Sequence, residues 1–228
     1  MERKYYEAYD DRYRQIHGQN LQWFDDNPTP IVWEIADTYG ITPSHRVLEL
    51  GCGEGRDAQL LLNKGYDLLA TDISSAAIAF ASKKWPEFAD RFSVLDCVNG
   101  DLPEKFDFIY AIAVLHMLVE DPDRNQFYSF IRDHLNQGGI GLICTMGDGE
   151  FERQSDSSKA FELQSRIHEQ SGREVLIAST TCRMVSFDTF HKELRQNGLE
   201  ILQEGVTSSP PDFTQLMYAV VRPLREDH

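Results

Sequence analysis

Short apolar segments alternate with helical segments between Pro43 and residue 146 of this chain. The apolar segments cover residues 46–50, 66–72, 91–97, 106–112 and 139–146. Hydrophobic strands separated by helices are typical of a parallel β-sheet that helices cover on both faces. The sequence therefore predicts a doubly wound α/β domain, in which a ligand binds beyond the carboxyl ends of the strands.

The segments between these strands have the features of helices. They cover residues 56–65, 74–85 and 122–139. Gly65 and Gly138 are expected to end the first and the last of them, because glycine readily adopts the left-handed conformation that follows many helices. Ser74 is the better candidate for capping the middle helix, next to Asp72.

The C-terminal part of the chain departs from this alternation. Ser186 and Gly198 are placed to begin and end a helix at 187–197, and strands are predicted at 199–207 and 215–223. The seven residues between these strands are too few for a helical crossover, so the two strands should be antiparallel. The predicted fold is a doubly wound, Rossmann-like, seven-stranded and mostly parallel sheet with an antiparallel C-terminal hairpin and helices on both faces.

Two segments lie outside this frame. Residues 1–44 are predicted to form an aromatic-rich helical extension, and residues 147–185 a polar insertion within the domain at 45–228. In the extension, tyrosines recur at four-residue spacing and share one helical face. Such a stripe is often ordinary core packing, but both segments are positioned to cover the strand ends. The residues predicted to form a lid over a substrate are Tyr6, Tyr13 and Trp23.

The charge of the chain bears on its partners. Lys and Arg total 22 against 37 Asp and Glu, which gives a net charge of −15. Nucleic-acid binding depends largely on neutralising phosphates with basic side chains, and no basic stripe stands out here. We therefore expect a small-molecule substrate and no nucleic acid.

The remaining composition gives no sign of a membrane segment or a metal site. The longest apolar run is far shorter than a membrane span, and the N-terminus lacks the apolar segment of a secretory signal, so a cytoplasmic location is expected. The cysteines are scattered without a Cys-x-x-Cys pair, which favours free thiols over metal ligands or disulfides. They are Cys52, Cys97, Cys144 and Cys182.

The glycine-rich turn "VLELGCGEGRDA" at residues 47–58 follows the first predicted strand. A dinucleotide-binding turn has a third glycine where this chain has Arg56, and a phosphate-binding P-loop would continue with Gly-Lys-Ser or Gly-Lys-Thr. Glu49, two residues before Gly51, instead favours a ligand with positive charge.

Carboxylates also follow the next two predicted strands. Asp72 lies 21 residues after Gly51, where an acidic side chain can accept hydrogen bonds from both hydroxyls of a ribose. Asp96 ends the third strand and could accept from an adenine amino group, with Val98 against the ring. The three strand ends together predict an adenosine ligand that carries a positive charge.

These motifs resemble those of class I S-adenosylmethionine-dependent methyltransferases. The resemblance covers residues 40–147 and rests on "VLELGCGEG", "ATDIS", "LDCV", "FDFIYAIAVLHML" and "LNQGGIGLI" in order. It implies S-adenosylmethionine as cofactor, with S-adenosylhomocysteine as product. The cofactor-binding residues that it implies are Glu49, Gly51, Cys52, Gly53, Arg56, Asp72, Ile73, Asp96, Cys97, Val98, Ala111 and Ile112.

A finer resemblance links "YEAYDDRYRQIHGQNLQW" and the turn region to the thiopurine and tellurite-resistance methyltransferase branch. It implies methyl transfer to a small nucleophile at N, O, S or a metalloid, although the insertion at 147–185 has no counterpart there. His116, after the fourth strand, is the candidate general base if the acceptor needs one. The chain is expected to be a monomer or a homodimer.

The sequence is also compatible with two other functions. An RNA or protein methyltransferase shares the cofactor domain, but the fourth strand lacks the Asn/Asp-Pro-Pro-aromatic segment of amino-directed nucleic-acid enzymes. A non-catalytic module that only binds S-adenosylmethionine is the alternative from another class, on fold analogy alone.

Overall fold

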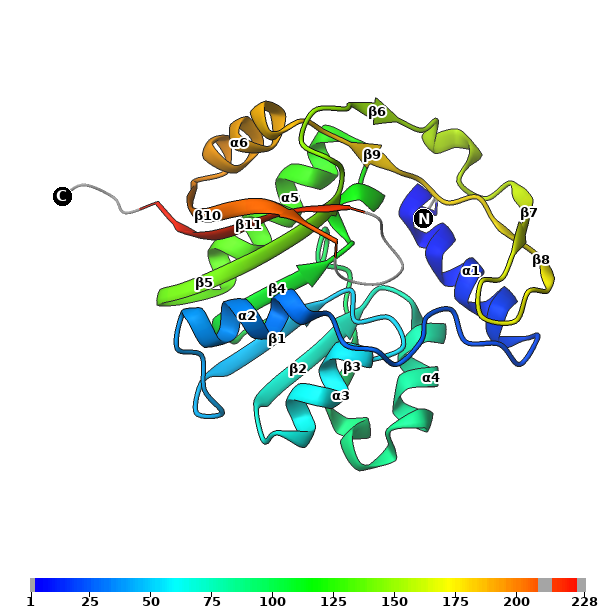
Figure 1. Cartoon of the computed structure of the whole chain (residues 1–228), viewed down its shortest axis with the longest axis horizontal. Helices are drawn as coiled ribbons and strands as arrows, with labels where there is room; N and C mark the ends of the chain where they lie inside the picture. The colour runs from blue at the N-terminus through cyan, green and yellow to red at the C-terminus, as the bar shows by residue number, and fades with distance from the viewer. Residues whose placement is uncertain (1–2, 209–214, 225–228) are drawn as a thin grey trace.

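The computed structural model describes residues 3–208 and 215–224, and its centre is a seven-stranded sheet (Figure 1). The strand order is β10-β11-β5-β4-β1-β2-β3. β11 runs antiparallel to both of its neighbours, whereas β1 to β5 pair in parallel. The strands are β1 (Arg46–Leu50), β2 (Asp67–Asp72), β3 (Phe92–Val94), β4 (Phe106–Ile112), β5 (Leu135–Met146), β10 (Leu199–Thr207) and β11 (Leu216–Pro223). The predicted fold class is confirmed, while the predicted link between the last two strands lies, apart from Ser208, outside the described residues.

Helices cover both faces of this sheet. On one face α2 (Pro30–Thr38), α3 (Arg56–Asn63) and α4 (Ser75–Lys84) share an apolar core with the side chains of β1, β2 and β4. On the other face α5 (Asp121–His134) and α6 (Phe187–Gln196) pack against the alternate side chains of β1, β4 and β5. In Figure 1, α5 and α6 lie in the upper part of the molecule, and α2, α3 and α4 lie lower down. The alternation of strand side chains thus places each helix where its apolar face is buried.

Capping residues and glycines predicted from the sequence mark several of the helix ends. Ser74 caps α4 by accepting a hydrogen bond from the Ala77 N–H at 3.0 Å, as predicted. Gly65 follows α3 with φ of +82°, a conformation that favours glycine. The prediction that Gly138 ends a helix is wrong, because α5 ends at His134 and Gly138 lies within β5. The chain enters the sheet directly after α5, where Leu135 pairs with Phe106.

The N-terminal segment and the insertion meet beyond the carboxyl ends of the strands. The short helix η1 (Tyr5–Glu7) leads into α1 (Ala8–His17), which packs against the hairpin of β7 (Leu163–Ile167) and β8 (Glu174–Ala178), as Figure 1 shows. Ile16 packs with Val175 and Ile177 of this hairpin. The other short elements are η2 (Pro86–Arg91), η3 (Leu115–Met117), β6 (Arg153–Gln154), η4 (Ser157–Lys159) and β9 (Arg183–Met184).

The division into a 1–44 extension and a 45–228 domain stays a prediction. α1 lies against the insertion and α4, whereas α2 belongs to the helical layer on the sheet. Among the described helices, none has the length and apolar character needed to cross a membrane.

Candidate active site

The glycine turn after β1 is held tightly against its neighbours. The Gly51 and Cys52 N–H groups both donate to the Thr71 carbonyl, at 2.7 and 2.9 Å. Gly51 has φ of +74°, and a Cβ at this position would lie 2.3 Å from Cγ2 of Val114. Only glycine fits here, so the backbone forms a close-fitting floor for whatever binds above it.

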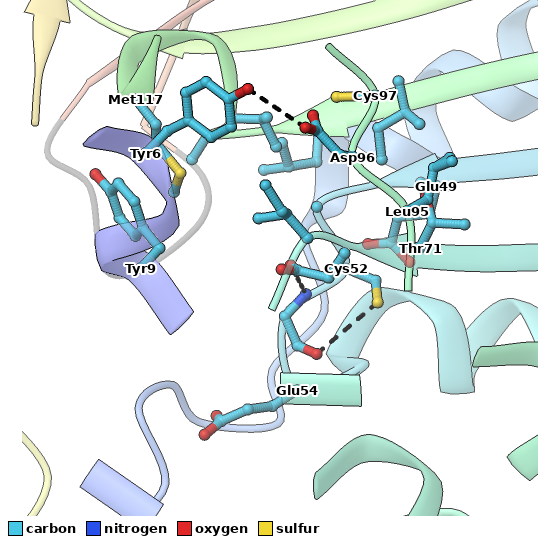
Figure 2. Close-up of a pocket in the computed structure, with 18 of the residues that line it drawn as sticks. Tyr6, Tyr9, Glu49, Cys52, Glu54, Thr71, Leu95, Asp96, Cys97 and Met117 are labelled. Atoms are coloured by element: carbon cyan, nitrogen blue, oxygen red, sulfur yellow. Dashed lines mark hydrogen bonds between the residues drawn. The ribbon is translucent and has the colours of Figure 1, made fainter. Parts of the chain in front are cut away.

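A cavity of about 110 Å³ lies over this turn, at the carboxyl ends of β1, β2 and β4 (Figure 2). Its walls bring together eleven of the twelve residues predicted to bind the cofactor. They are Glu49, Gly51, Cys52, Gly53, Arg56, Asp72, Ile73, Asp96, Cys97, Val98 and Ile112. The twelfth, Ala111, is fully buried and packs in the core under α5 and α6, because strand alternation turns it to that face.

Asp72 is fixed by two backbone donors at the end of β2. Its oxygens accept hydrogen bonds from the Gly53 N–H at 2.9 Å and from the Ser74 N–H at 2.8 Å. Burial outweighs these donors and raises the pKa of Asp72 to about 6. The carboxylate is therefore ionised at neutral pH and retains lone pairs for a further donor in the cavity.

Glu49 lies deeper, on β1. Its Oε2 accepts a hydrogen bond from the Tyr110 hydroxyl at 2.9 Å, and only 4% of the residue is exposed. Burial and then the nearby charge of Asp57 raise the pKa of Glu49 well above its usual value. A cation placed in the cavity would oppose both effects and favour the ionised carboxylate.

Asp96, after β3, contacts the N-terminal segment. Its Oδ2 accepts a hydrogen bond from the Tyr6 hydroxyl at 3.3 Å (Figure 2). Oδ2 also accepts from Nδ2 of Asn99 at 2.8 Å, and Oδ1 accepts from the Val98 N–H at 2.9 Å. The Tyr6 ring is almost fully buried. The carboxylate is thus oriented by its own loop and covered by an aromatic residue from 90 positions earlier in the chain.

Aromatic side chains of the N-terminal segment form the roof of the cavity. Two of the three residues predicted to form a lid, Tyr6 and Tyr13, line the cavity together with Tyr9 and Phe24, and their role over a substrate stays a prediction. The guanidinium of Arg56 stacks on the Phe24 ring at 4.9 Å. The roof therefore consists of rings that present an apolar surface opposite the carboxylates of the strand ends.

Glu54 in the glycine turn anchors this roof. Its carboxylate accepts from the backbone N–H groups of Trp23 and Phe24, at 2.7 and 3.1 Å, and lies 2.8 Å from Nε2 of His17. Neither Glu54 nor Phe24 was predicted as a site residue. The sequence shows Glu54 only as an acidic residue inside the turn. Its role could not be predicted, because its partners lie some 30 positions earlier in the chain.

A second and larger cavity of about 540 Å³ adjoins the first. Four residues line both cavities and form the wall between them: Tyr9, Tyr13, Phe24 and Met117. The rest of the second cavity is built from α1, the loop at Trp23, the η3 segment and the insertion. Trp23, predicted as a lid residue, lines this second cavity and not the first.

His116 also lines the second cavity, and it is 4% exposed. Burial, followed by the charges of Arg124 and Arg12, lowers the pKa of His116 to about 3. The imidazole is therefore neutral at physiological pH and only weakly basic. Its assignment as a general base stays a prediction that this environment weakens.

Comparison with known proteins agrees with this geometry. Residues 48–140 match the model of a family described as a methyltransferase domain. The "Probable S-adenosyl-L-methionine-dependent methyltransferase TehB" of Haemophilus influenzae is 33% identical over 122 residues, which cover 51% of this chain and 41% of that protein. This chain spans less than half the length of the curated relatives it matches.

Solved structures share the fold over nearly the whole chain. The 1,6-didemethyltoxoflavin-N1-methyltransferase of Burkholderia thailandensis has a TM-score of 0.71 at 16% identity, covering 99% of this chain and 92% of its own. A methyltransferase dependent on S-adenosylmethionine from Clostridium acetobutylicum has a TM-score of 0.67 at 18% identity, covering 97% and 99%. Residues 48–140 thus match a methyltransferase domain, and the chain has the fold of solved methyltransferases, in agreement with the resemblance that its sequence motifs carry.

Proposed function

We propose that this chain transfers a methyl group from S-adenosylmethionine to a small-molecule nucleophile. The observation that carries the proposal is the pair of adjoining cavities that share one wall. The first has the carboxylates expected around a cationic adenosine. The second is a separate space, next to the first, in which an acceptor could lie.

The first cavity fits S-adenosylmethionine by the chemistry of its walls. Its acidic lining residues are Glu49, Glu54, Asp57, Asp72 and Asp96, whereas Arg56 is the basic residue of the lining. A diphosphate would be repelled by this set, and a sulfonium or an ammonium would be attracted. Asp72 would accept hydrogen bonds from the ribose hydroxyls, and Asp96 would accept one from the adenine amino group. The buried carboxylates near the turn would face the amino acid part of the cofactor.

S-adenosylmethionine, when bound, supplies an activated methyl group on a sulfonium, so the difficult chemistry belongs to the cofactor. The protein has to hold the acceptor atom in line with that methyl group and to keep water out. Positioning of this kind is worth roughly 7–11 kcal/mol. Tyr9, Tyr13, Phe24 and Met117 occupy the shared wall, where an acceptor would approach the methyl group.

The neutral state of His116 bears on the kind of acceptor. A histidine with a pKa of about 3 accepts a proton poorly at neutral pH, although it can still orient a ligand by hydrogen bonding. A soft or already ionised nucleophile needs no protein base. This supports an acceptor whose reactive atom is nucleophilic on its own at physiological pH.

Calorimetry with the purified chain tests the cofactor assignment. S-adenosylhomocysteine is expected to bind, NADH is expected not to bind, and Asp72→Ala should lose most of the affinity. Binding of NADH alone would refute the assignment. Methyl transfer is then measured as S-adenosylhomocysteine formed with a panel of small thiols, amines, phenols and oxyanions. Tight binding without turnover on any member would favour a non-catalytic binding module.

A further inference from the structure

The second cavity contains a buried cation, Arg12 of α1. The residue is 7% exposed, and its Nε and Nη2 donate to the Ala178 carbonyl at 3.2 and 3.0 Å. Nη2 also donates to the Ser179 carbonyl at 2.7 Å and to Oγ1 of Thr180 at 2.6 Å. The third nitrogen, Nη1, donates to no acceptor within the described part of the chain. The guanidinium is therefore fixed on one side by the insertion and available on the other.

The charge of Arg12 has aromatic and backbone neighbours but no carboxylate partner. Its guanidinium carbon lies 5.1 Å from the centroid of the Trp23 ring and 5.2 Å from that of Tyr9. Among residues 3–208 and 215–224, no Asp or Glu oxygen forms an ion pair with it. Burial lowers its pKa to about 10, which leaves it charged at neutral pH. A buried and unpaired charge is costly, and an anion beside it would remove that cost.

The mouth of the same cavity has mixed charge. Arg153, Lys159 and Arg166 line it on exposed positions of the insertion, together with Asp156, Glu162 and Glu169. Asp156 is engaged in accepting from Ser158 at the start of η4. Arg166 is close enough to Arg12 for its charge to lower the pKa of that residue. Arg12 makes the buried end of the cavity positive, and Arg166 adds positive charge nearby, in a chain whose net charge is −15.

We propose that the second cavity binds an acceptor that is a small organic acid with a flat apolar part. The anionic group pairs with Arg12 and, nearer the mouth, with Arg166, because two guanidinium groups can bind one carboxylate through charge-assisted hydrogen bonds. The flat part lies along the rings of Trp23 and Phe24, which line the same space. This inference rests on the proposed function for the identity of the ligand as an acceptor, but the anion site itself can be tested without turnover.

The test is a comparison of 2-naphthoate with its neutral counterpart 2-naphthamide. Both are titrated by calorimetry into the full chain saturated with S-adenosylhomocysteine, and into the chain alone. The acid is expected to bind about tenfold more tightly than the amide, as charge-assisted hydrogen bonds allow. Arg166→Gln and Arg12→Gln should each reduce that ratio. Arg166 carries the test if the Arg12 variant fails to fold, since its side chain is exposed.

Arg173→Gln is the matched control, because Arg173 is an exposed arginine of the same hairpin that lines neither cavity. It should keep the full tenfold ratio. Equal binding of acid and amide, binding of neither, or a ratio unchanged in the Arg166 variant would overturn the proposal. Sulfate that binds as tightly as 2-naphthoate would show that the flat part contributes nothing. That result would overturn the proposed site for a flat apolar group. Failure of S-adenosylhomocysteine to bind refutes the proposed function separately, because its own binding is measured by calorimetry before the acid and the amide are added.

Discussion

The hydroxyl of Tyr6 lies 3.3 Å from Oδ2 of Asp96, so the N-terminal segment closes directly onto the end of the third strand. The same hydroxyl accepts a hydrogen bond from Nδ2 of Asn99 at 2.7 Å. A ligand in the first cavity is therefore enclosed by a segment that has to move before the ligand can leave. The strength of this one contact should set how fast the cofactor product is released.

Tyr6→Phe is expected to speed the dissociation of S-adenosylhomocysteine about fivefold. A hydrogen bond of ordinary strength is worth about 1 kcal/mol, which corresponds to a factor of about five in a rate. The factor applies if the bond from Tyr6 to Asp96 has to break before the ligand leaves. Stopped-flow displacement measures the rate. Tyr66→Phe is the control, because the Tyr66 hydroxyl also donates one hydrogen bond, to the Ile41 carbonyl at 3.1 Å. Equal rates in the two variants would show that the Tyr6 contact does not retain the ligand.

Cofactor affinity should depend on pH through Asp72. Its pKa of about 6 is raised by burial, and only the ionised form accepts from both the backbone N–H groups and a ribose. Affinity is therefore close to its maximum at pH 7 and is lost as the pH falls through about 6. Between pH 7 and pH 5 the dissociation constant of S-adenosylhomocysteine should rise about tenfold, following the ionised fraction.

Asp72→Asn provides the control for this titration, because an amide does not ionise in this range. The variant should bind weakly at both pH values, with a pH dependence much smaller than that of the natural chain. A natural chain whose affinity is the same at pH 5 and pH 7 would exclude ionised Asp72 as a ligand-binding group.

Parts of the fold that depend on local patterns could be predicted from the sequence to the residue. β1, β4 and β10 coincide with the predicted strands at 46–50, 106–112 and 199–207. Most apolar side chains of β1 and β4 are buried, whereas in the edge strand β10 Leu199 is buried and Val206 is exposed, so local alternation predicted these strands even where burial is partial. The third strand is shorter than predicted, at Phe92–Val94, because the Leu95 N–H makes its last bond to the Asp72 carbonyl before the chain turns.

Features that depend on contacts between distant segments could not be predicted. Phe24 and Tyr9 line the first cavity because Glu54 and the insertion hold the N-terminal segment over it. The hairpin of β7 and β8 is stabilised by apolar contacts with Ile16 of α1, which no local pattern in the polar insertion indicates. Trp23 lines the second cavity and not the first as a result of the same packing.

A buried ion pair should stabilise the loop that carries His116. Glu193 of α6 accepts from Nε and Nη2 of Arg124 at 2.9 and 2.6 Å, and Nη1 of Arg124 donates to the Leu115 and Leu118 carbonyls on either side of that loop. Glu193→Gln leaves the buried guanidinium without its counter-charge, so the free energy of unfolding should fall by about 3 kcal/mol. Urea denaturation measures the change.

An ion pair that is more exposed than Arg124 and Glu193 offers the comparison for this variant. Arg222 and Glu200 lie 2.8 Å apart at the surface of the C-terminal hairpin, and pairs of this kind contribute at most about 1 kcal/mol. Glu200→Gln should therefore cost far less than Glu193→Gln. Equal losses would mean that the Arg124 network does not fix the loop.

The fit between Gly53 and Tyr13 should control cofactor binding independently of backbone strain. Gly53 has φ of +53°, and a Cβ there would lie 2.6 Å from the Tyr13 hydroxyl, whereas Gly40 has φ of +67° and open space around it. Gly53→Ala and Gly40→Ala should each lose about 1 kcal/mol of unfolding free energy, from the strain of a left-handed alanine. Only Gly53→Ala displaces the roof, so it alone should weaken S-adenosylhomocysteine binding, by about tenfold.

Adding Tyr13→Phe to Gly53→Ala removes the clashing oxygen and should restore part of that affinity, as measured by calorimetry. A double variant that binds no better than Gly53→Ala would rule out the clash as the cause.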